Sequence, residues 1–201
     1  MIKRNLLVMG LAVLLSACGF QLRGTGTTEL AIKELDLSAR NAYGETVTQL
    51  RQVLESSGVK VYTGAPYKLI LTDEQESQRI LSYAGAGRTG EYQVSTVLSY
   101  DIRGEGDLPL LSNKLEVQKV FIHDGNNLVG SDQEATTARV ESRRELVQRM
   151  MLRLSQLTPT QLDQLQQTAE AKAKADAAAL EAAQKAEAET PRQSPIDIPQ
   201  Q

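Results

Sequence analysis

The sequence predicts an α+β fold in which two helices pack on one face of a mostly antiparallel, roughly four-stranded sheet. Three observations predict it. Several runs carry an apolar or β-branched residue at every second position, which is the period of a half-buried strand. Two stretches, one early and one late in the chain, have apolar residues three and four positions apart, the period of an amphipathic helix. Short turns join the later strands, which favours antiparallel hairpins with both helices on one face.

The first half of the chain predicts a short strand, a helix and the start of a long strand. Residues 30–37 suit a short strand of mixed pattern. Gly58 ends the helix that follows, a short β-branched run occupies residues 59–62, and the long strand covers 67–83 with a polar middle. The helix is predicted from apolar residues that recur at helical spacing: Tyr43, Val47, Leu50 and Leu54, with Val53 beside them.

The second half predicts two more strands and a longer helix. The clearest strand alternates over residues 92–102, and a turn at 104–109 leads to a strand at 115–122 with apolar residues on both faces. The helix runs from about residue 131 to 157, and Ser131 or Asp132 can cap it. Its apolar stripe consists of Val140, Val147, Met150, Met151 and Leu154.

The composition changes after Thr158. Residues 169–188 hold eleven alanines, and Leu180 is the one large apolar residue among them. Alanine favours helix, but this segment has no wide apolar stripe to bury. We therefore expect a solvated helix over 159–188, with a partner-binding helix as the alternative, and a disordered, proline-containing end over 190–201.

The first seventeen residues have the pattern of a secretory signal. Lys3 and Arg4 precede an apolar run over residues 6–15 that is too short to span a bilayer as a helix. The run ends in Leu15-Ser16-Ala17-Cys18, which resembles the lipobox of bacterial lipoproteins. That resemblance implies that Cys18 is acylated and becomes the mature N-terminus. A glycine at position 19, where retention in the inner membrane is associated with aspartate, favours the outer membrane.

Composition excludes several classes of function. One cysteine and one histidine cannot form an internal disulfide or a four-ligand zinc site of the usual kind, and no cofactor is expected. A net charge of −3 argues against broad binding to nucleic acid. Residues 85–90 match the letters GxGxxG, but a strand follows them where a dinucleotide site needs a helix, so they predict a hairpin loop. His123, at a strand end, is better explained as a structural polar residue than as a catalytic one.

One loop arginine and a group of helix arginines are candidates for anion binding. Arg88 occupies a glycine-rich loop with no acidic neighbour before Glu91, so its guanidinium could hold a phosphate, or it is an ordinary exposed arginine. Five arginines and two glutamates share the late helix, which indicates a salt-bridged, solvated face, with an anion-binding face as the alternative. These arginines are Arg139, Arg143, Arg144, Arg149 and Arg153.

The start of the mature chain resembles a known family. The heptapeptide at residues 18–24, Cys-Gly-Phe-Gln-Leu-Arg-Gly, is similar to the mature N-terminus of the LPS-assembly lipoproteins of the LptE family, as is the Glu91-Tyr92-Gln93 strand start. The resemblance covers residues 18–158. It implies an outer-membrane lipoprotein that plugs the β-barrel LptD, assists its assembly, binds lipopolysaccharide and supports delivery of that lipid to the cell surface, without catalysing a reaction.

The resemblance also implies a site and a domain layout. The family's lipopolysaccharide contacts are basic residues in the loop before the strand at 91 and in the loop after the last strand. Arg88 matches the first, and Lys119 is the nearest substitute for the second, because residues 124–132 contain no lysine or arginine. The expected layout is a signal peptide at 1–17, a lipid-anchored domain at 18–158 and a low-complexity tail at 159–201.

A second class of function remains as the alternative: a periplasmic lipoprotein enzyme or a general envelope scaffold. An enzyme would depend on His123, and a scaffold would depend on its alanine-rich tail. The predicted location in the leading interpretation is the periplasmic side of the outer membrane and the interior of the partner barrel.

Overall fold

The computed structural model describes residues 30–84 and 89–189, and within them it has the α+β order that the sequence predicts. Cys18 and Arg88 lie outside the described residues. The elements are β1 (Glu34–Ala39), α2 (Glu45–Ser56), β2 (Lys60–Val61), β3 (Tyr67–Ala84), β4 (Thr89–Arg103), the 3₁₀ turn η1 (Glu105–Asp107), β5 (Pro109–Asp124), α3 (Leu128–Ser155) and α4 (Pro159–Glu189).

The described strands form one mixed sheet in the order β2-β1-β3-β4-β5. The β3, β4 and β5 strands pair antiparallel along almost their whole length, as the sequence predicts. In contrast, β1 pairs in parallel with β2 and with β3, because α2 carries the chain back across the sheet between β1 and β2. Since β1 contacts only residues 67–71 of β3, most of β3 has a neighbour on one side alone.

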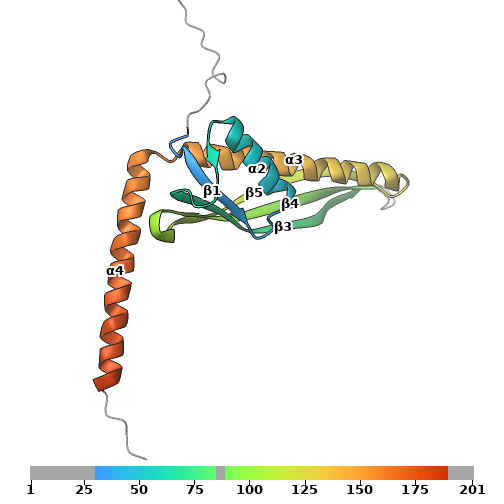
Figure 1. Cartoon of the computed structure of the whole chain (residues 1–201). Helices are drawn as coiled ribbons and strands as arrows, with labels where there is room; N and C mark the ends of the chain where they lie inside the picture. Colours follow the sequence, from blue (N-terminus) through green and yellow to red (C-terminus); the bar gives the residue numbers. More distant parts are fainter. Residues whose placement is uncertain (1–29, 85–88, 190–201) are drawn as a thin grey trace, which may run out of the picture.

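Helices α2 and α3 lie on the same face of the sheet, and α3 runs along most of the length of the long hairpin (Figure 1). Burial of apolar side chains between these layers supplies the main stabilisation of the fold. The residues that are buried almost completely come from every layer and include Leu35, Leu50, Leu54, Leu69, Leu98, Tyr100, Leu146, Met150 and Leu154.

The early helix begins later than its periodicity predicts. Gly44 is its N-cap, and Tyr43 is 97% exposed, so the prediction that Tyr43 belongs to the apolar stripe is wrong. Val47, Leu50 and Leu54 are buried as expected. The helix ends before Gly58, whose φ of +83° lies in the left-handed region that a residue without a Cβ adopts readily.

The late helix begins one turn earlier than predicted. Its N-cap is Asn127, whose side-chain oxygen accepts a hydrogen bond of 3.1 Å from the Gly130 amide, so neither Ser131 nor Asp132 caps it. Instead, the Ser131 hydroxyl accepts a 2.7 Å bond from the Asp124 amide and ties the helix to the end of β5.

The inner face of α3 also differs from the predicted stripe. Val140 is exposed, and three small residues, Ala135, Ala138 and Ser142, are buried in its place. Ala135 and Ala138 pack against Val94 and Phe121 in a second, smaller core cluster towards the end of the hairpin. Small side chains allow the helix to approach the sheet closely there, and an apolar periodicity does not detect them.

The alanine-rich segment is part of helix α4, and the first turns of this helix, before the alanines, belong to the domain. Thr158 and Gln161 cap it reciprocally, with the Gln161 amide donating to the Thr158 hydroxyl (3.2 Å) and the Thr158 amide donating to the Gln161 side chain (3.0 Å). Leu162 is buried against the core, whereas beyond Glu170 every described side chain is exposed. From there α4 extends away from the sheet (Figure 1). None of the described helices is long and apolar enough to cross a membrane.

Candidate functional site

The face of the sheet opposite α2 and α3 is built mainly from polar side chains. Alternation along β4 directs Leu98 and Tyr100 into the core, so Ser95, Val97 and Ser99 face the other way. In the paired strands this face continues with polar residues: Asp73, Gln75, Ser77 and Arg79 on β3, and Lys114, Glu116 and Gln118 on β5. A broad polar face on a sheet of this length remains uncovered by helices.

Hydrogen bonds between side chains, within and across strands, hold this polar sheet face together. The Arg79 guanidinium donates twice to the Gln93 side-chain oxygen, at 2.8 and 3.0 Å. Glu116 accepts from Gln118 at 2.7 Å and from Ser95 at 2.9 Å, and these two bonds lower the pKa of the Glu116 carboxyl. The face therefore combines satisfied internal bonds with further donors and acceptors that are open to a polar partner.

Two arginines of α3 form ion pairs with other elements, and a third pairs within the helix. Arg139 contacts Glu76 of β3 at 2.7 Å, Arg143 contacts Glu45 of α2, and Arg149 contacts Glu145 at 2.5 Å. Arg149 also donates to the backbone oxygen of Glu116 on β5. These pairs confirm the predicted salt-bridged face, with the arginines serving mainly to join α3 to its neighbours.

Lys119 is one of the two predicted lipopolysaccharide contacts, and the structure gives it an internal partner. It lies on β5 opposite Val94, and its ammonium is 2.7 Å from the Glu145 carboxylate. Hydrogen bonds from Lys119 and then from Arg149 lower the pKa of Glu145. Because Glu145 neutralises Lys119, the lysine presents less free positive charge than the sequence alone suggests. Arg88, the other predicted contact, and Cys18, the predicted lipidation site, lie outside the described residues.

His123 occupies the structural position that the sequence predicts. It is half-buried near the end of β5, with its ring centroid 4.9 Å from that of Tyr92. Its neighbour Asp124 accepts from the Asn126 amide at 2.9 Å and from the Thr89 hydroxyl, and hydrogen bonds of this kind lower the Asp124 pKa. These bonds close the turn between β5 and α3. Among the described residues no group of three or more His, Cys, Asp or Glu side chains could hold a metal ion.

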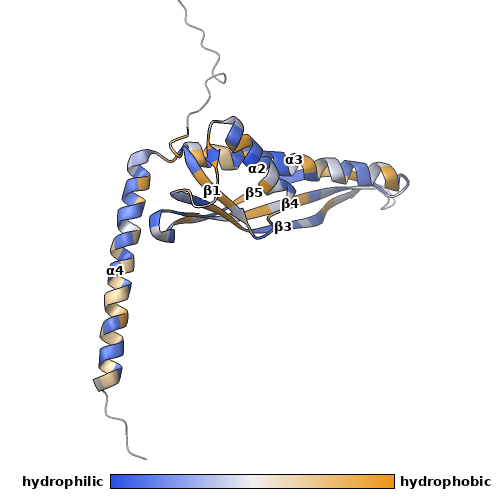
Figure 2. Cartoon of the chain, in the orientation of Figure 1, coloured by the Kyte–Doolittle hydropathy of each residue, from blue (hydrophilic) through white to orange (hydrophobic). Residues whose placement is uncertain are grey.

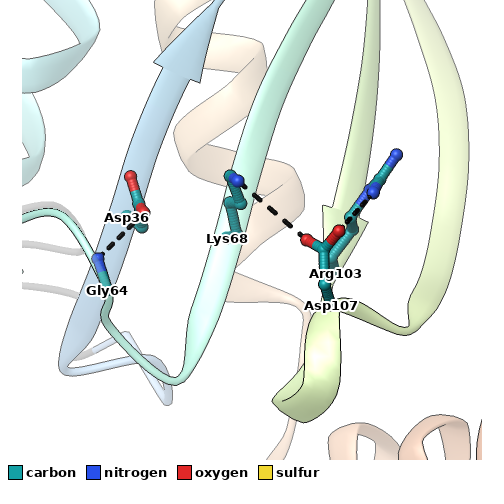
Figure 3. A network of polar contacts seen from close by, with 5 residues as sticks. All are labelled: Asp36, Gly64, Lys68, Arg103 and Asp107. Carbon is teal, nitrogen blue, oxygen red and sulfur yellow. Dashed lines mark hydrogen bonds and ion pairs between the residues drawn. The ribbon is translucent and has the colours of Figure 1, made fainter.

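A charged network joins the strands at the end of the sheet where β3 begins and β4 ends, far from His123. Lys68 and Arg103 are cross-strand neighbours, and both contact Asp107, at 3.9 and 2.7 Å respectively (Figure 3). Asp36, which pairs with Lys68 in the register of β1 and β3, accepts from the Gly64 amide at 3.0 Å. The network fixes the η1 turn, where Asp107 has a φ of +60°. Sequence reasoning identified the turn but could not place these side chains beside one another.

The domain shares its fold with solved bacterial lipoproteins. The rare lipoprotein B from Shewanella oneidensis aligns with a TM-score of 0.55 at 20% identity, over 61% of this chain and 93% of that one. The uncharacterized lipoprotein B from Nitrosomonas europaea aligns with a TM-score of 0.56 at 19% identity, over 69% of this chain and 89% of that one. At this level of identity the likeness establishes the fold, which is that of a class of lipoprotein domains.

Sequence comparison identifies the particular family. The family model described as LptE, lipopolysaccharide-assembly, matches residues 32–154. The LPS-assembly lipoprotein LptE of Pectobacterium atrosepticum is 30% identical over 162 residues, which cover 77% of this chain and 86% of that protein. Its counterpart in Yersinia enterocolitica is 28% identical over 156 residues, 74% of each chain. The chain belongs to the LptE lipopolysaccharide-assembly family, as the N-terminal heptapeptide predicted. This membership confirms the prediction that the chain is not an enzyme.

Proposed function

We propose that this chain is an outer-membrane lipoprotein that occupies the interior of the LptD barrel as a plug, assists assembly of that barrel and contacts lipopolysaccharide. The observation that carries the proposal is the polar sheet face. A domain whose second face were apolar would need a helix layer or a hydrophobic partner to cover it. A polar face with satisfied cross-strand bonds suits the polar interior of a membrane barrel.

The anchor is proposed to be the lipidated Cys18. The mature chain would begin there, and Leu30, the first described residue, is already buried in the core. The twelve residue-to-residue steps from Cys18 to Leu30 span at most about 40 Å when the chain is extended. The tether would therefore hold the domain close to the membrane and raise its effective concentration beside a membrane-embedded barrel. Residues 1–17 would be the cleaved signal, 18–158 the lipid-anchored domain and 159–201 an appended tail.

Contact with lipopolysaccharide is proposed at the basic residues Arg88 and Lys119. Arg88 belongs to the link between β3 and β4, at one end of the hairpin, where a guanidinium can reach a phosphate with two donors. Lys119 would contribute only where an anionic group competes with Glu145 for its ammonium. Replacing Arg88 with glutamate is therefore expected to weaken lipopolysaccharide binding more than replacing Lys119 does.

The plug is tested by co-purification of LptD with tagged variants from detergent-extracted outer membranes. Ser77 is exposed on the polar sheet face, whereas Gln148 is exposed on α3. If the sheet face lies against the barrel wall, Ser77→Trp lowers the yield of LptD and the matched variant Gln148→Trp does not. Recovery of no barrel protein with the unaltered chain would refute the proposal.

Two further variants separate the plug from a scaffold and test the anchor. Deletion of residues 170–201 removes the exposed part of α4, which a scaffold would need and a plug would not. Cys18→Ala is expected to leave the chain uncleaved or released from the membrane. Normal membrane attachment of Cys18→Ala would contradict the proposed lipid anchor.

A further inference from the structure

The strongest unassigned feature of the molecule is an apolar end of the long hairpin. We define the hairpin tip as the described residues where β3 meets β4 and where β5 leads into α3. Seven large apolar side chains there are between 42% and 83% exposed: Ile80, Leu81, Tyr83, Val120, Ile122, Leu128 and Val129. The other exposed large apolar residues of the described chain are scattered singly over several elements. Exposed apolar side chains gathered at one end of a domain mark an interaction site.

These side chains point in several directions. Val120 and Ile122 alternate with Phe121 and His123, which face Tyr92 and the small core cluster, so they lie on the polar sheet face. Ile80 pairs with Tyr92 on the helix side of the sheet, and Leu81 is the unpaired residue of the strand irregularity that follows it.

The remaining three exposed apolar residues of the tip, Tyr83, Leu128 and Val129, lie beyond these. A Cβ on Gly90 would lie 3.5 Å from the Tyr92 ring and 3.6 Å from the Tyr83 ring, so Tyr83 extends the helix side beyond Tyr92. Leu128 and Val129 form the first turn of α3, and Figure 2 shows hydrophobic colour at this end of the helix. Apolar side chains that point in several directions cannot all contact one flat protein surface. Flexible hydrocarbon chains can contact them all.

The charges of the hairpin tip support the same conclusion. The described tip residues include no lysine or arginine, and the two carboxylates are occupied internally. Glu91 accepts a 3.1 Å bond from Ser82, and Asp124 accepts from Asn126 and Thr89. The nearest cations, Arg79 and Lys119, are bound to Gln93 and Glu145. The described tip therefore offers no cation to a phosphate group. Its charged groups are two carboxylates that accept internal hydrogen bonds, and its exposed apolar side chains are complementary to hydrocarbon.

From this arrangement we propose that the hairpin tip inserts among the acyl chains of lipopolysaccharide. The inference rests on the proposed function, which it deepens by separating a chain-binding surface from the phosphate contact at Arg88. We choose lipopolysaccharide as the source of these acyl chains because the chain belongs to a lipopolysaccharide-assembly family. The exposed polar residues Ser82 and Glu91 interrupt the apolar surface, so the tip suits a few chains rather than the depth of a bilayer.

The test uses the purified mature chain and three forms of lipopolysaccharide: intact, deacylated with its phosphates kept, and dephosphorylated with its chains kept. The double variant Ile122→Glu/Val129→Glu alters the tip, and Leu152→Glu, at a side chain 59% exposed elsewhere on α3, is the matched control. The unaltered chain should bind the intact and dephosphorylated forms and bind the deacylated form at least tenfold more weakly. The tip variant should lose about tenfold to a hundredfold in affinity for intact lipopolysaccharide, whereas the control keeps it.

Each contrary result has a distinct meaning. Equal binding by the tip variant and the Leu152→Glu control, or tight binding of the deacylated form, overturns the chain-binding tip and leaves the phosphate contact standing. Equally tight binding to phospholipid vesicles without lipopolysaccharide also overturns it, in favour of a general membrane contact. Failure of the unaltered chain to bind any form refutes lipopolysaccharide binding in the proposed function as well. Because the altered side chains are exposed, an unchanged melting temperature verifies that the variants fold.

Discussion

Replacing Leu162 with alanine tests whether the start of α4 is part of the folded domain. Leu162 is 3% exposed and packs against the main core, and one turn later Gln166 donates at 3.3 Å to the backbone oxygen of Glu105. Leu180 on the same helix is 60% exposed, with no such packing. The same substitution at the two positions therefore compares a docked side chain with a free one.

The expected magnitude follows from burial. Truncating a buried leucine destabilises a protein by about 2–5 kcal/mol, the larger values arising where the surroundings cannot relax into the cavity. Leu162 sits at the margin of the core on a terminal helix, so a value of about 2–3 kcal/mol is expected. In a chain of this size that lowers the melting temperature by roughly 4–12 °C. Leu180→Ala should change stability by less than about 0.5 kcal/mol.

Thermal and urea unfolding of the mature chain, followed by circular dichroism, measure both variants. If Leu162→Ala melts at the same temperature as Leu180→Ala, the docking of α4 contributes nothing, and residues 159–189 form an appendage that the domain does not need. A fall in stability for both variants alike would instead mean that the exposed part of α4 has a stabilising contact that its exposure does not indicate.

Three further predictions concern the hairpin tip and α3. Asn127→Ala removes the N-cap of α3 and should destabilise the chain by about 1 kcal/mol in urea unfolding, whereas an unchanged midpoint would show that the cap is dispensable. Gly90→Ala places a Cβ 2.6 Å from the Ser82 backbone oxygen, so it should lower the melting temperature and speed amide exchange in the β3–β4 hairpin, and wild-type exchange there would contradict the close approach. The pKa of Glu145 is depressed in the folded state, so its contribution to stability is complete above the ordinary value of 4.5 and is lost as pH falls through the lower folded value. Glu145→Gln should therefore flatten the acid side of the stability profile, and an identical slope between pH 3 and 5 for both proteins would refute this role.

Local periodicity predicted most elements, and its failures have physical causes. The alternation over residues 92–102 specified which side of β4 is buried, because register and burial are both set by a period of two. Tyr43 fits the helical spacing of Val47 and Leu50 but precedes the N-cap, and spacing does not show where a chain enters a helix. In α3 the core positions near the tip hold alanine and serine, because the helix lies close to the sheet, so a search for large apolar residues selected Val140 instead.

Non-local contacts were beyond sequence reasoning. The parallel pairing of β1 with β3 depends on the path of the chain through α2, and nothing in the residues of β1 encodes its direction. The neutralisation of Lys119 by Glu145 joins residues of β5 and α3 that only the folded sheet brings together. The apolar tip likewise combines three separate segments, each of which is an ordinary strand or helix end in the sequence.

Two long strands of the sheet, β5 and the part of β3 beyond β1, have a free side, and both have features that hinder unwanted pairing. Beyond β1, the free side of β3 is interrupted by irregularities between Leu71 and Asp73 and between Ile80 and Ser82, with the acidic residues Glu74 and Glu76 between them. On β5, the Arg149 side chain occupies the Glu116 backbone oxygen that a foreign strand would need. Bulges, charges and blocked carbonyls are the means by which natural sheets avoid edge-to-edge aggregation. These features favour a domain that stays monomeric while its long strands are still free of a partner protein.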